Sequence, residues 1–259
     1  MSGSVSFDRA ADYYDATRLT DDAALGRILS LLEQELPGRV LEIGAGTGQL
    51  AVPLAARGVP VTGLDLSPVM LAQLRAKPGG AAVPLVNGDA SRLPFADAAF
   101  EGAYARWVLH LIPEWEGVLD ELIRAVGPDG AIAIEPGGVG GVYRDLFERF
   151  LAILGDAAMP PGLPPLDRDV RLGEAMHRRG WASVRTEPVV YDRSRTLRGY
   201  FDDVPRREMS WTWRVPDPDL ADATDDVRAW AGERYDLDAP QPEVPTTWHV
   251  YRRGRWMAA

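Results

Sequence analysis

One stretch near the start of the chain limits what it can fold into. Residues 40–43 form a short apolar run that suits a strand buried on both faces of a sheet. Gly44, Gly46 and Gly48 follow at alternate positions, and glycine lets a backbone turn sharply and approach a ligand with no Cβ atom in the way. A helix is expected to begin near Thr47, with its free amide groups facing that ligand. The stretch therefore predicts an α/β fold with a binding site at its first strand-to-helix turn.

The spacing of the glycines separates the cofactor classes that use such a turn. The dinucleotide fingerprint places its third glycine three residues after the second, where this chain has Gln49. A phosphate-binding loop needs a closing Gly-Lys-Ser/Thr, which is missing here. The alternate spacing, preceded by Glu42, instead resembles motif I of the class I S-adenosylmethionine-dependent methyltransferases. Taken alone, the turn still allows an NAD(P)-dependent oxidoreductase or a purely structural role.

Two acids end the next predicted strands and narrow these alternatives. Asp65 follows residues 59–64, and Asp89 follows residues 82–86. Both would lie at the carboxyl edge, where open α/β sheets bind ligands. The Asp65 carboxylate can accept hydrogen bonds from two ribose hydroxyls, and Ser67 is the better cap for the following helix. Asp89 has a structural alternative, a turn that it closes with its own side chain.

Further segments, in the same order along the chain, resemble the Methyltransferase type 11 family, the ubiquinone and menaquinone biosynthesis type. They are the aromatic and acidic segment 7–18, residues 67–71 (Ser-Pro-Val-Met-Leu), and residues 105–113, which lead from a strand to a helix. The resemblance implies S-adenosylmethionine as cofactor and S-adenosylhomocysteine as product. It implies that the cofactor contacts Tyr14, Arg18, Glu42, Gly44, Ala45, Gly46, Gly48, Asp65, Leu66, Met70, Asp89, Ala90 and Arg106. Packing roles remain alternatives for Tyr14, Arg18 and Met70.

Two residues are candidates for acid-base chemistry on the acceptor. His110 is the only histidine in the predicted site region, and a neutral imidazole can act as a general base. Its apolar neighbours equally suit a hydrogen-bonded structural histidine. Glu135 ends the fifth predicted strand at the same edge as Asp65, which makes it a possible acid in the acceptor site. The Asn/Asp-Pro-Pro-aromatic tetrad of nucleic-acid amino-methyltransferases is absent.

The resemblance implies a Rossmann-like sheet of seven strands, mostly parallel with an antiparallel last strand, helices on both faces and a helical lid. We expect a single domain over residues 1–259, with residues 1–36 over the cofactor and residues 37–135 as the cofactor-binding core. Residues 196–245 form a helical cap between strands six and seven. The aromatic residues of the cap form either its own small core or a wall of the acceptor site. The last strand, residues 246–251, alternates as a partly exposed antiparallel strand does.

Composition excludes several other classes of function. The chain has 259 residues, a net charge of -10 and no cysteine, so disulfides and thiolate chemistry are excluded. The acidic balance argues against nucleic acid as a partner, and basic pairs such as Arg178 with Arg179 are expected to be solvated surface. No apolar run is long enough to span a membrane, which predicts a cytoplasmic protein. No metal site is predicted, and oligomeric state is not predicted.

The expected reaction is methyl transfer to a small-molecule acceptor by in-line displacement at the sulfonium methyl. A protein that binds S-adenosylmethionine without transferring its methyl group is a further alternative. Binding residues and catalytic residues are different sets, so sequence motifs for one do not establish the other.

Overall fold

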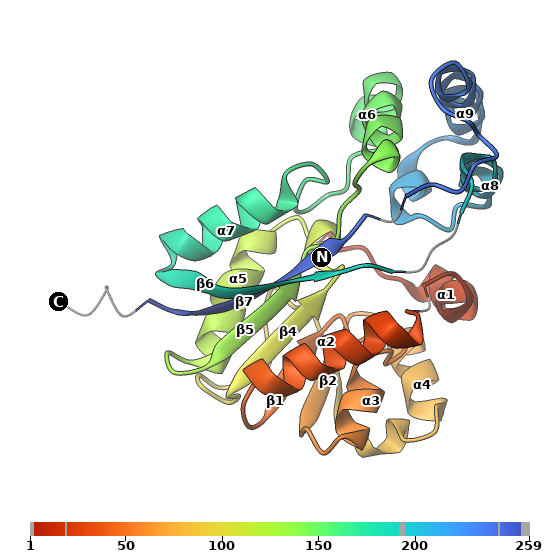
Figure 1. The fold of residues 1–259 in the computed structure, drawn as a ribbon. Helices are drawn as coiled ribbons and strands as arrows, with labels where there is room; N and C mark the ends of the chain where they lie inside the picture. Colours follow the sequence, from red (N-terminus) through yellow and green to blue (C-terminus); the bar gives the residue numbers. More distant parts are fainter. Residues whose placement is uncertain (1–2, 19, 192–194, 243, 255–259) are drawn as a thin grey trace.

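The computed structural model describes residues 3–18, 20–191, 195–242 and 244–254. Residues 1, 2 and 19 of the predicted N-terminal segment and residue 243 of the predicted cap lie outside these ranges. Its centre is a seven-stranded sheet in the order β3-β2-β1-β4-β5-β7-β6 (Figure 1). The strands from β3 to β5 are parallel, and β7 runs antiparallel to both β5 and β6. This confirms the predicted fold class. The bounds are β1 Val40–Ile43, β2 Val61–Asp65, β3 Leu85–Asn87, β4 Gly102–Arg106, β5 Ala131–Glu135, β6 Trp181–Val189 and β7 Thr246–Arg253.

The register of the central strands brings the predicted site residues to one edge. Ile43 at the end of β1 pairs with Leu64 of β2 on one side and with Ala105 of β4 on the other. The next residues along each chain, Gly44, Asp65 and Arg106, therefore lie side by side. All of β1 is buried, as its apolar sequence predicts.

Helices cover both faces of the sheet. One face carries α2 Asp22–Glu35, α3 Ala51–Ala56 and α4 Pro68–Ala76, and the other carries α5 Trp115–Val126 and α7 Arg168–Arg178. The prediction that a helix begins near Thr47 is wrong, because α3 begins at Ala51. The left-handed backbone at Gly48 is incompatible with a helix and delays its start. Short 3-10 turns lie at Gly80–Ala82, Leu109–Leu111, Gly155–Ala157, Val204–Arg206 and Ser210–Arg214.

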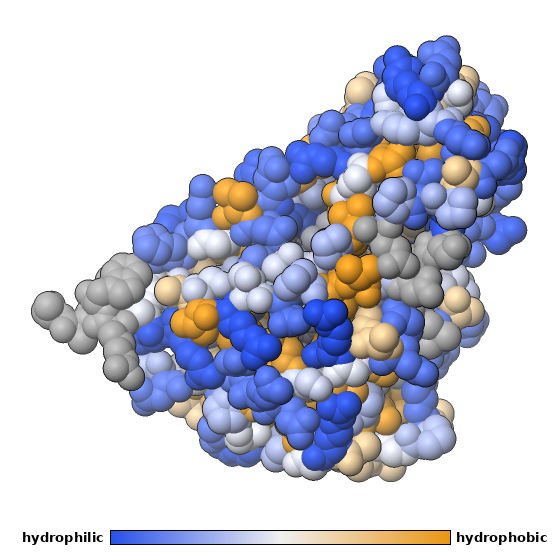
Figure 2. All heavy atoms as spheres, in the orientation of Figure 1, coloured by the Kyte–Doolittle hydropathy of each residue, from blue (hydrophilic) through white to orange (hydrophobic). Residues whose placement is uncertain are grey.

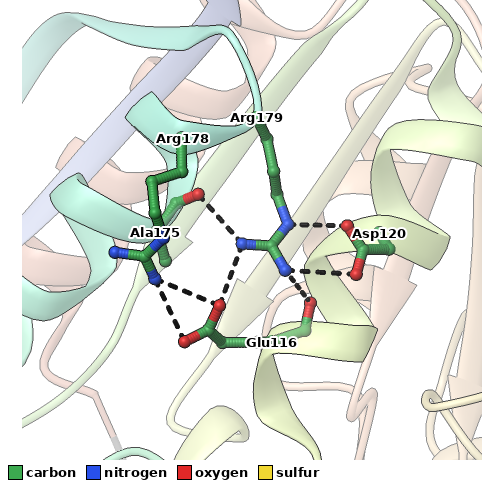
Figure 3. Close-up of polar contacts among 5 residues, drawn as sticks. All are labelled: Glu116, Asp120, Ala175, Arg178 and Arg179. Atoms are coloured by element: carbon green, nitrogen blue, oxygen red, sulfur yellow. Dashed lines mark hydrogen bonds and ion pairs between the residues drawn. The ribbon is translucent and has the colours of Figure 1, made fainter.

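The basic pair Arg178 and Arg179 ties α7 to α5 (Figure 3). Arg179 Nε donates to Asp120 Oδ1 at 2.6 Å, and Arg178 Nη2 donates to both carboxylate oxygens of Glu116 at 3.1 Å. The pair is thus neutralised by acids of this chain. It provides no basic surface for a nucleic acid.

Helices that stand off the sheet form a cap with a core of its own (Figure 1). It consists of α8 Leu197–Asp203, α9 Asp217–Gly232 and also α6 Val142–Leu154, a helix that precedes β6 and that we had not predicted to join the cap. Most cap aromatics, among them Phe201 and Trp211, pack inside this core. Trp213 differs, since its ring lies 4.7 Å from the ring of Phe7 in the N-terminal segment. Figure 2 shows hydrophobic surface where the cap meets the body.

The last strand is antiparallel and partly exposed, as predicted. β7 lies between β5 and β6, and Trp248, Val250 and Tyr251 are at most 1% exposed. Its two faces pack against the two opposite cores of the sheet, so that Tyr251 departs from the predicted alternation. Within the described ranges, every helix is too short or too polar to span a lipid bilayer.

Candidate active site

The turn after β1 holds its three glycines in left-handed backbone conformations. Gly44, Gly46 and Gly48 have φ angles of 71°, 53° and 80°. A Cβ atom on Gly44 would lie 2.9 Å from Val108 Cγ2, and one on Gly46 would lie 3.5 Å from Met70 Cε. The bare backbone therefore forms one wall of a hollow that a side chain at either position would begin to fill.

Replacing Gly48 with alanine is expected to lower the free energy of unfolding by about 2–4 kcal/mol. The new Cβ would lie 2.5 Å from Leu74 Cγ, in a backbone conformation that disfavours alanine. Gly26→Ala is the matched control, because Gly26 lies in α2 with no atom within 4 Å of the added carbon. It is expected to stabilise the protein by about 0.5–1 kcal/mol. Urea denaturation measures both, and equal effects would contradict this account of the turn.

Asp65 ends β2 and reaches back to the glycine turn. Its Oδ2 accepts a hydrogen bond from the Gly46 amide and its Oδ1 accepts one from the Ser67 amide, both at 2.8 Å. Burial raises the pKa of this carboxyl, while the amide bonds oppose the shift. Each oxygen can accept a further hydrogen bond, so Asp65 can still bind two ligand hydroxyls. Ser67 caps α4 through Met70, as predicted.

Asp89 closes a local turn and also lines the hollow. Its Oδ1 accepts hydrogen bonds from the Ser91 amide at 2.9 Å and the Ser91 hydroxyl at 2.8 Å, so it closes a local turn. It also lines the hollow beside Ala90. Closing this turn therefore does not take Asp89 out of the hollow.

A hollow of about 630 Å³, including the solvent at its mouth, opens at this edge of the sheet. A second hollow of about 330 Å³ adjoins it, and both are lined by Tyr14, Gly44, Gly46, Arg106 and Trp107. Between them they include most residues expected to bind a cofactor: Tyr14, Glu42, Gly44, Ala45, Gly46, Asp65, Leu66, Met70, Asp89, Ala90 and Arg106. Arg18, Gly48, His110 and Glu135 line neither hollow.

The family resemblance implies that the first residues of segment 105–113 lie against the sulfonium and the acceptor, but several apolar lining residues are not named by it individually. Phe7, Trp107, Val108 and Leu111 contribute to the first hollow. The signal that could have found three of them is the apolar run directly after β4, at the same edge as Asp65. Phe7 comes from a distant segment, and only its neighbours Tyr14 and Arg18 were singled out.

The N-terminal segment, a 3-10 turn Asp8–Ala10 followed by α1 Ala11–Arg18, is fastened to the core at this edge. Asp15 accepts a hydrogen bond from the Thr47 hydroxyl at 2.5 Å and forms an ion pair with Lys77. The Ser67 hydroxyl donates to Asp8, and the Val5 amide donates to the Leu111 carbonyl at 3.0 Å. Tyr14 thereby lines both hollows, and Val5 and Phe7 of the same segment line the first.

Glu135 is occupied by partners rather than free to act as an acid. Its Oε2 accepts hydrogen bonds from Arg106 Nε at 3.1 Å and from the Tyr191 hydroxyl at 2.9 Å. Its Oε1 accepts one from Trp107 Nε1 at 2.6 Å. Trp107 has a φ of 54°, and the guanidinium of Arg106 lies 3.9 Å from the centre of its ring. Glu135 therefore fixes the positions of two residues that line the hollows.

Glu42 carries a strongly shifted carboxyl in the middle of β1. It is 4% exposed, and its Oε2 accepts a hydrogen bond from the Tyr104 hydroxyl at 3.0 Å. Burial raises the pKa of Glu42 to about 8, although the bond from Tyr104 opposes the rise. The carboxyl is therefore mostly protonated in the folded protein at neutral pH and ionised in the unfolded chain.

This difference predicts how stability depends on pH. The folded pKa of about 8 exceeds the ordinary value of 4.5. Below pH 4.5 the carboxyl is protonated in both the folded and the unfolded state, so its contribution to stability is fully present. As pH rises from there through about 8, the unfolded chain ionises first and this contribution is lost. Glu42→Gln should remove this loss, so its unfolding free energy relative to wild type should rise by a few kcal/mol from about pH 5 to pH 8. Urea denaturation at a series of pH values measures it, and a pH-independent difference would contradict the shift.

His110 is buried within reach of the charges of two arginines. Burial, followed by the charges of Arg168 and Arg18, holds the pKa of His110 well below 6.5, so its imidazole is neutral at physiological pH. Its Nδ1 is buried with no hydrogen-bond partner in the described part of the chain. A neutral imidazole is the form that a general base needs, and that role stays a prediction.

Arg168, the first residue of α7, is 9% exposed. Its Nε donates to the Pro164 carbonyl and its Nη1 to the Pro136 carbonyl, both at 3.1 Å. Burial lowers the pKa of Arg168 to about 10, which leaves the guanidinium charged at neutral pH. Over residues 3–18, 20–191, 195–242 and 244–254, no set of three His, Cys, Asp or Glu side chains is arranged to hold a metal ion.

Proteins similar to this chain in sequence include methyltransferases. A family model described as a methyltransferase domain matches residues 41–134. A demethylmenaquinone methyltransferase of Thermus thermophilus is 35% identical over 139 residues, which are 50% of this chain and 63% of that protein. The match thus spans less than two thirds of the Thermus protein. Another demethylmenaquinone methyltransferase, from Beutenbergia cavernae, is 30% identical over 199 residues, with 69% of this chain and 82% of that protein covered.

Solved structures share the fold at low sequence identity. A putative methyltransferase from an antibiotic biosynthesis pathway of Anabaena variabilis has a TM-score of 0.63 and 19% identity. The match covers 91% of this chain and 98% of that protein. The likeness therefore extends through the cap as well as the sheet.

Proposed function

This chain belongs to the S-adenosylmethionine-dependent methyltransferase family, and we propose that it transfers the methyl group of that cofactor to a small-molecule acceptor. Use of S-adenosylmethionine follows from membership of the family and replaces the dinucleotide alternative. The observation that carries the proposal is the hollow in which the glycine turn, Asp65 and Asp89 meet.

The residues around the two hollows fit this cofactor. We assign Asp65 to the ribose hydroxyls, because its oxygens retain free acceptor sites. Asp89, Ala90 and Met70 line the same hollow, and we assign them to the adenine. Arg106 Nη2 is buried and has no hydrogen-bond partner among the described residues. A ligand carboxylate beside it would satisfy this donor, so we assign Arg106 to the methionine end, together with Tyr14 and Arg18.

The bound cofactor supplies a methyl group on a sulfonium, which is already activated for displacement. The protein therefore has to hold the two reactants in line and keep water out. The N-terminal segment serves the second task, since its contacts to Thr47, Lys77 and Leu111 hold it over the site edge. Glu135 contributes by positioning Arg106 and Trp107.

Two observations support a small acceptor. The net charge is -10, and the basic pair Arg178 and Arg179 is neutralised by acids. The relatives reported above carry demethylmenaquinone in their names, which supports the same class of acceptor.

Calorimetry and a turnover screen test the proposal. We expect the protein to bind S-adenosylhomocysteine, and to produce it from S-adenosylmethionine when a suitable acceptor from a metabolite panel is added. A thermal shift with NAD or NADP is the control for the dinucleotide class, and no shift is expected. Absence of binding to both S-adenosylmethionine and S-adenosylhomocysteine would overturn the proposal.

A further inference from the structure

We propose that the acceptor carries a carboxylate, and that Arg168 binds this group beside the indole of Trp107. The inference rests on the methyl-transfer function proposed above and adds the chemical class of its substrate. It starts from a buried guanidinium that has carbonyl partners but no carboxylate partner among the described residues.

The contacts of Arg168 place it next to the wall of the site. A Cβ atom added to Gly137 would lie 3.2 Å from Arg168 Nη1 and 2.9 Å from Trp107 Cδ1, so guanidinium and indole edge are neighbours. Trp107 lines both hollows. Its ring is thus flanked by two guanidinium groups, with Arg106 over its face and Arg168 at its edge. Only Arg106 has a carboxylate partner, Glu135.

The same neighbourhood contains a second unused donor. The Gly162 amide donates to the His110 carbonyl at 3.0 Å, and the Pro164 carbonyl accepts from Arg168 Nε. This short loop therefore joins His110 to Arg168. A neutral imidazole protonated on Nδ1 can donate a hydrogen bond, and His110 Nδ1 has no acceptor in the described chain. Arg168 Nη2 also makes no hydrogen bond there and, unlike Arg106 Nη2, is not sealed from solvent.

Basic side chains gather near His110, although the chain as a whole is acidic. Among the described residues Arg18 bonds only to the carbonyls of Thr17 and Glu208, and the charge of the Glu208 carboxylate also acts on it. Asp169, the next residue in the chain, forms a hydrogen bond with His249 at 2.7 Å, and its charge only partly opposes the effect of burial on Arg168. A buried guanidinium with no hydrogen-bonded carboxylate is costly, and a ligand carboxylate at Arg168 Nη2 would offset that cost.

A purely structural role for Arg168 makes a different prediction. Its hydrogen bonds to Pro136 and Pro164 join two loops. If this link were its only role, losing it would lower the melting temperature and weaken the binding of every acceptor by the same factor. Recognition of a carboxylate would instead change the preference between an acid and its uncharged amide. The two roles are therefore separated by a ratio of affinities, which a general loss of stability leaves unchanged.

The test uses calorimetry on the full chain saturated with S-adenosylhomocysteine. The probes are matched pairs with aromatic bodies of increasing size: benzoate and benzamide, cinnamate and cinnamamide, indole-3-acetate and indole-3-acetamide, 2-naphthoate and 2-naphthamide. We expect at least one acid to bind tenfold or more tightly than its amide. Arg168→Met should abolish that preference, Arg168→Lys should keep part of it, and both should bind S-adenosylhomocysteine within about twofold of wild type. Arg171→Met, on the exposed side of α7, is the matched control and should preserve the preference.

The outcomes distinguish this inference from the proposed function. If wild-type protein binds S-adenosylhomocysteine but no acid better than its amide, the carboxylate inference is overturned and the function stands. A preference that survives in Arg168→Met also overturns it. Failure to bind S-adenosylhomocysteine at the start overturns the proposed function itself. The comparison in wild-type protein decides the matter even if the methionine variant does not fold.

Discussion

Replacing Asp65 with alanine is expected to weaken the binding of S-adenosylhomocysteine by about 30-fold to 1000-fold, as measured by calorimetry at neutral pH. The assigned carboxylate accepts two ribose hydroxyls, and loss of both hydrogen bonds costs about 2–4 kcal/mol. Asp65 also holds the Gly46 amide, which forms part of the glycine turn. The variant therefore loses a ligand contact and the support of the turn together.

Two further variants separate these effects. Asp65→Asn keeps one carbonyl oxygen but loses the charge, so it should bind with intermediate affinity. Asp129→Ala is the matched control, since Asp129 is an exposed acid in the turn before β5, at the opposite edge of the sheet, and should bind like wild type. Equal affinity of Asp65→Ala and wild type would show that Asp65 does not bind the cofactor.

The parts of the site that could be predicted from sequence are those set by neighbours along the chain. Alternate glycines after an apolar run require a tight turn at any sheet edge, and an acid directly after a strand lies at that edge. The turn at Gly44 to Gly48 and the positions of Asp65 and Asp89 follow from these local rules. The order of the strands came from the family resemblance, which these motifs supported.

The remaining features depend on contacts between distant segments. Trp107 gives no local signal for a left-handed backbone, which is held by its bond to Glu135. Nothing in the sequence distinguishes Arg168 from the other charged residues of its helix, yet it is buried and donates to the Pro136 carbonyl. The burial of Tyr251 could not be predicted because it depends on packing against α5 and α7, which lie far along the chain. Helix α6 joins the cap through an apolar stripe whose partner, α9, lies far along the chain.

Glu135 shows why position at the site edge is not enough to predict a role. The sequence placed an acid beside the expected acceptor, and that edge is where Glu135 lies. Its two carboxylate oxygens accept hydrogen bonds from Arg106, Trp107 and Tyr191, and these bonds hold the three side chains in place. Such a role predicts a large effect on stability, and an effect on methyl transfer that acts through Arg106 and Trp107.

Replacing Glu135 with leucine is expected to lower the free energy of unfolding by about 3–5 kcal/mol, because it leaves the buried guanidinium of Arg106 without its carboxylate. Urea denaturation at neutral pH measures this loss. The double variant Glu135→Leu with Arg106→Met removes both charges, so it should be more stable than Glu135→Leu alone. Asp226→Ala breaks an ion pair with Arg149 that is about half exposed, and it should cost less than about 1 kcal/mol. If the two substitutions at Glu135 and Arg106 instead destabilise additively, the buried pair is not the reason that Glu135 is needed.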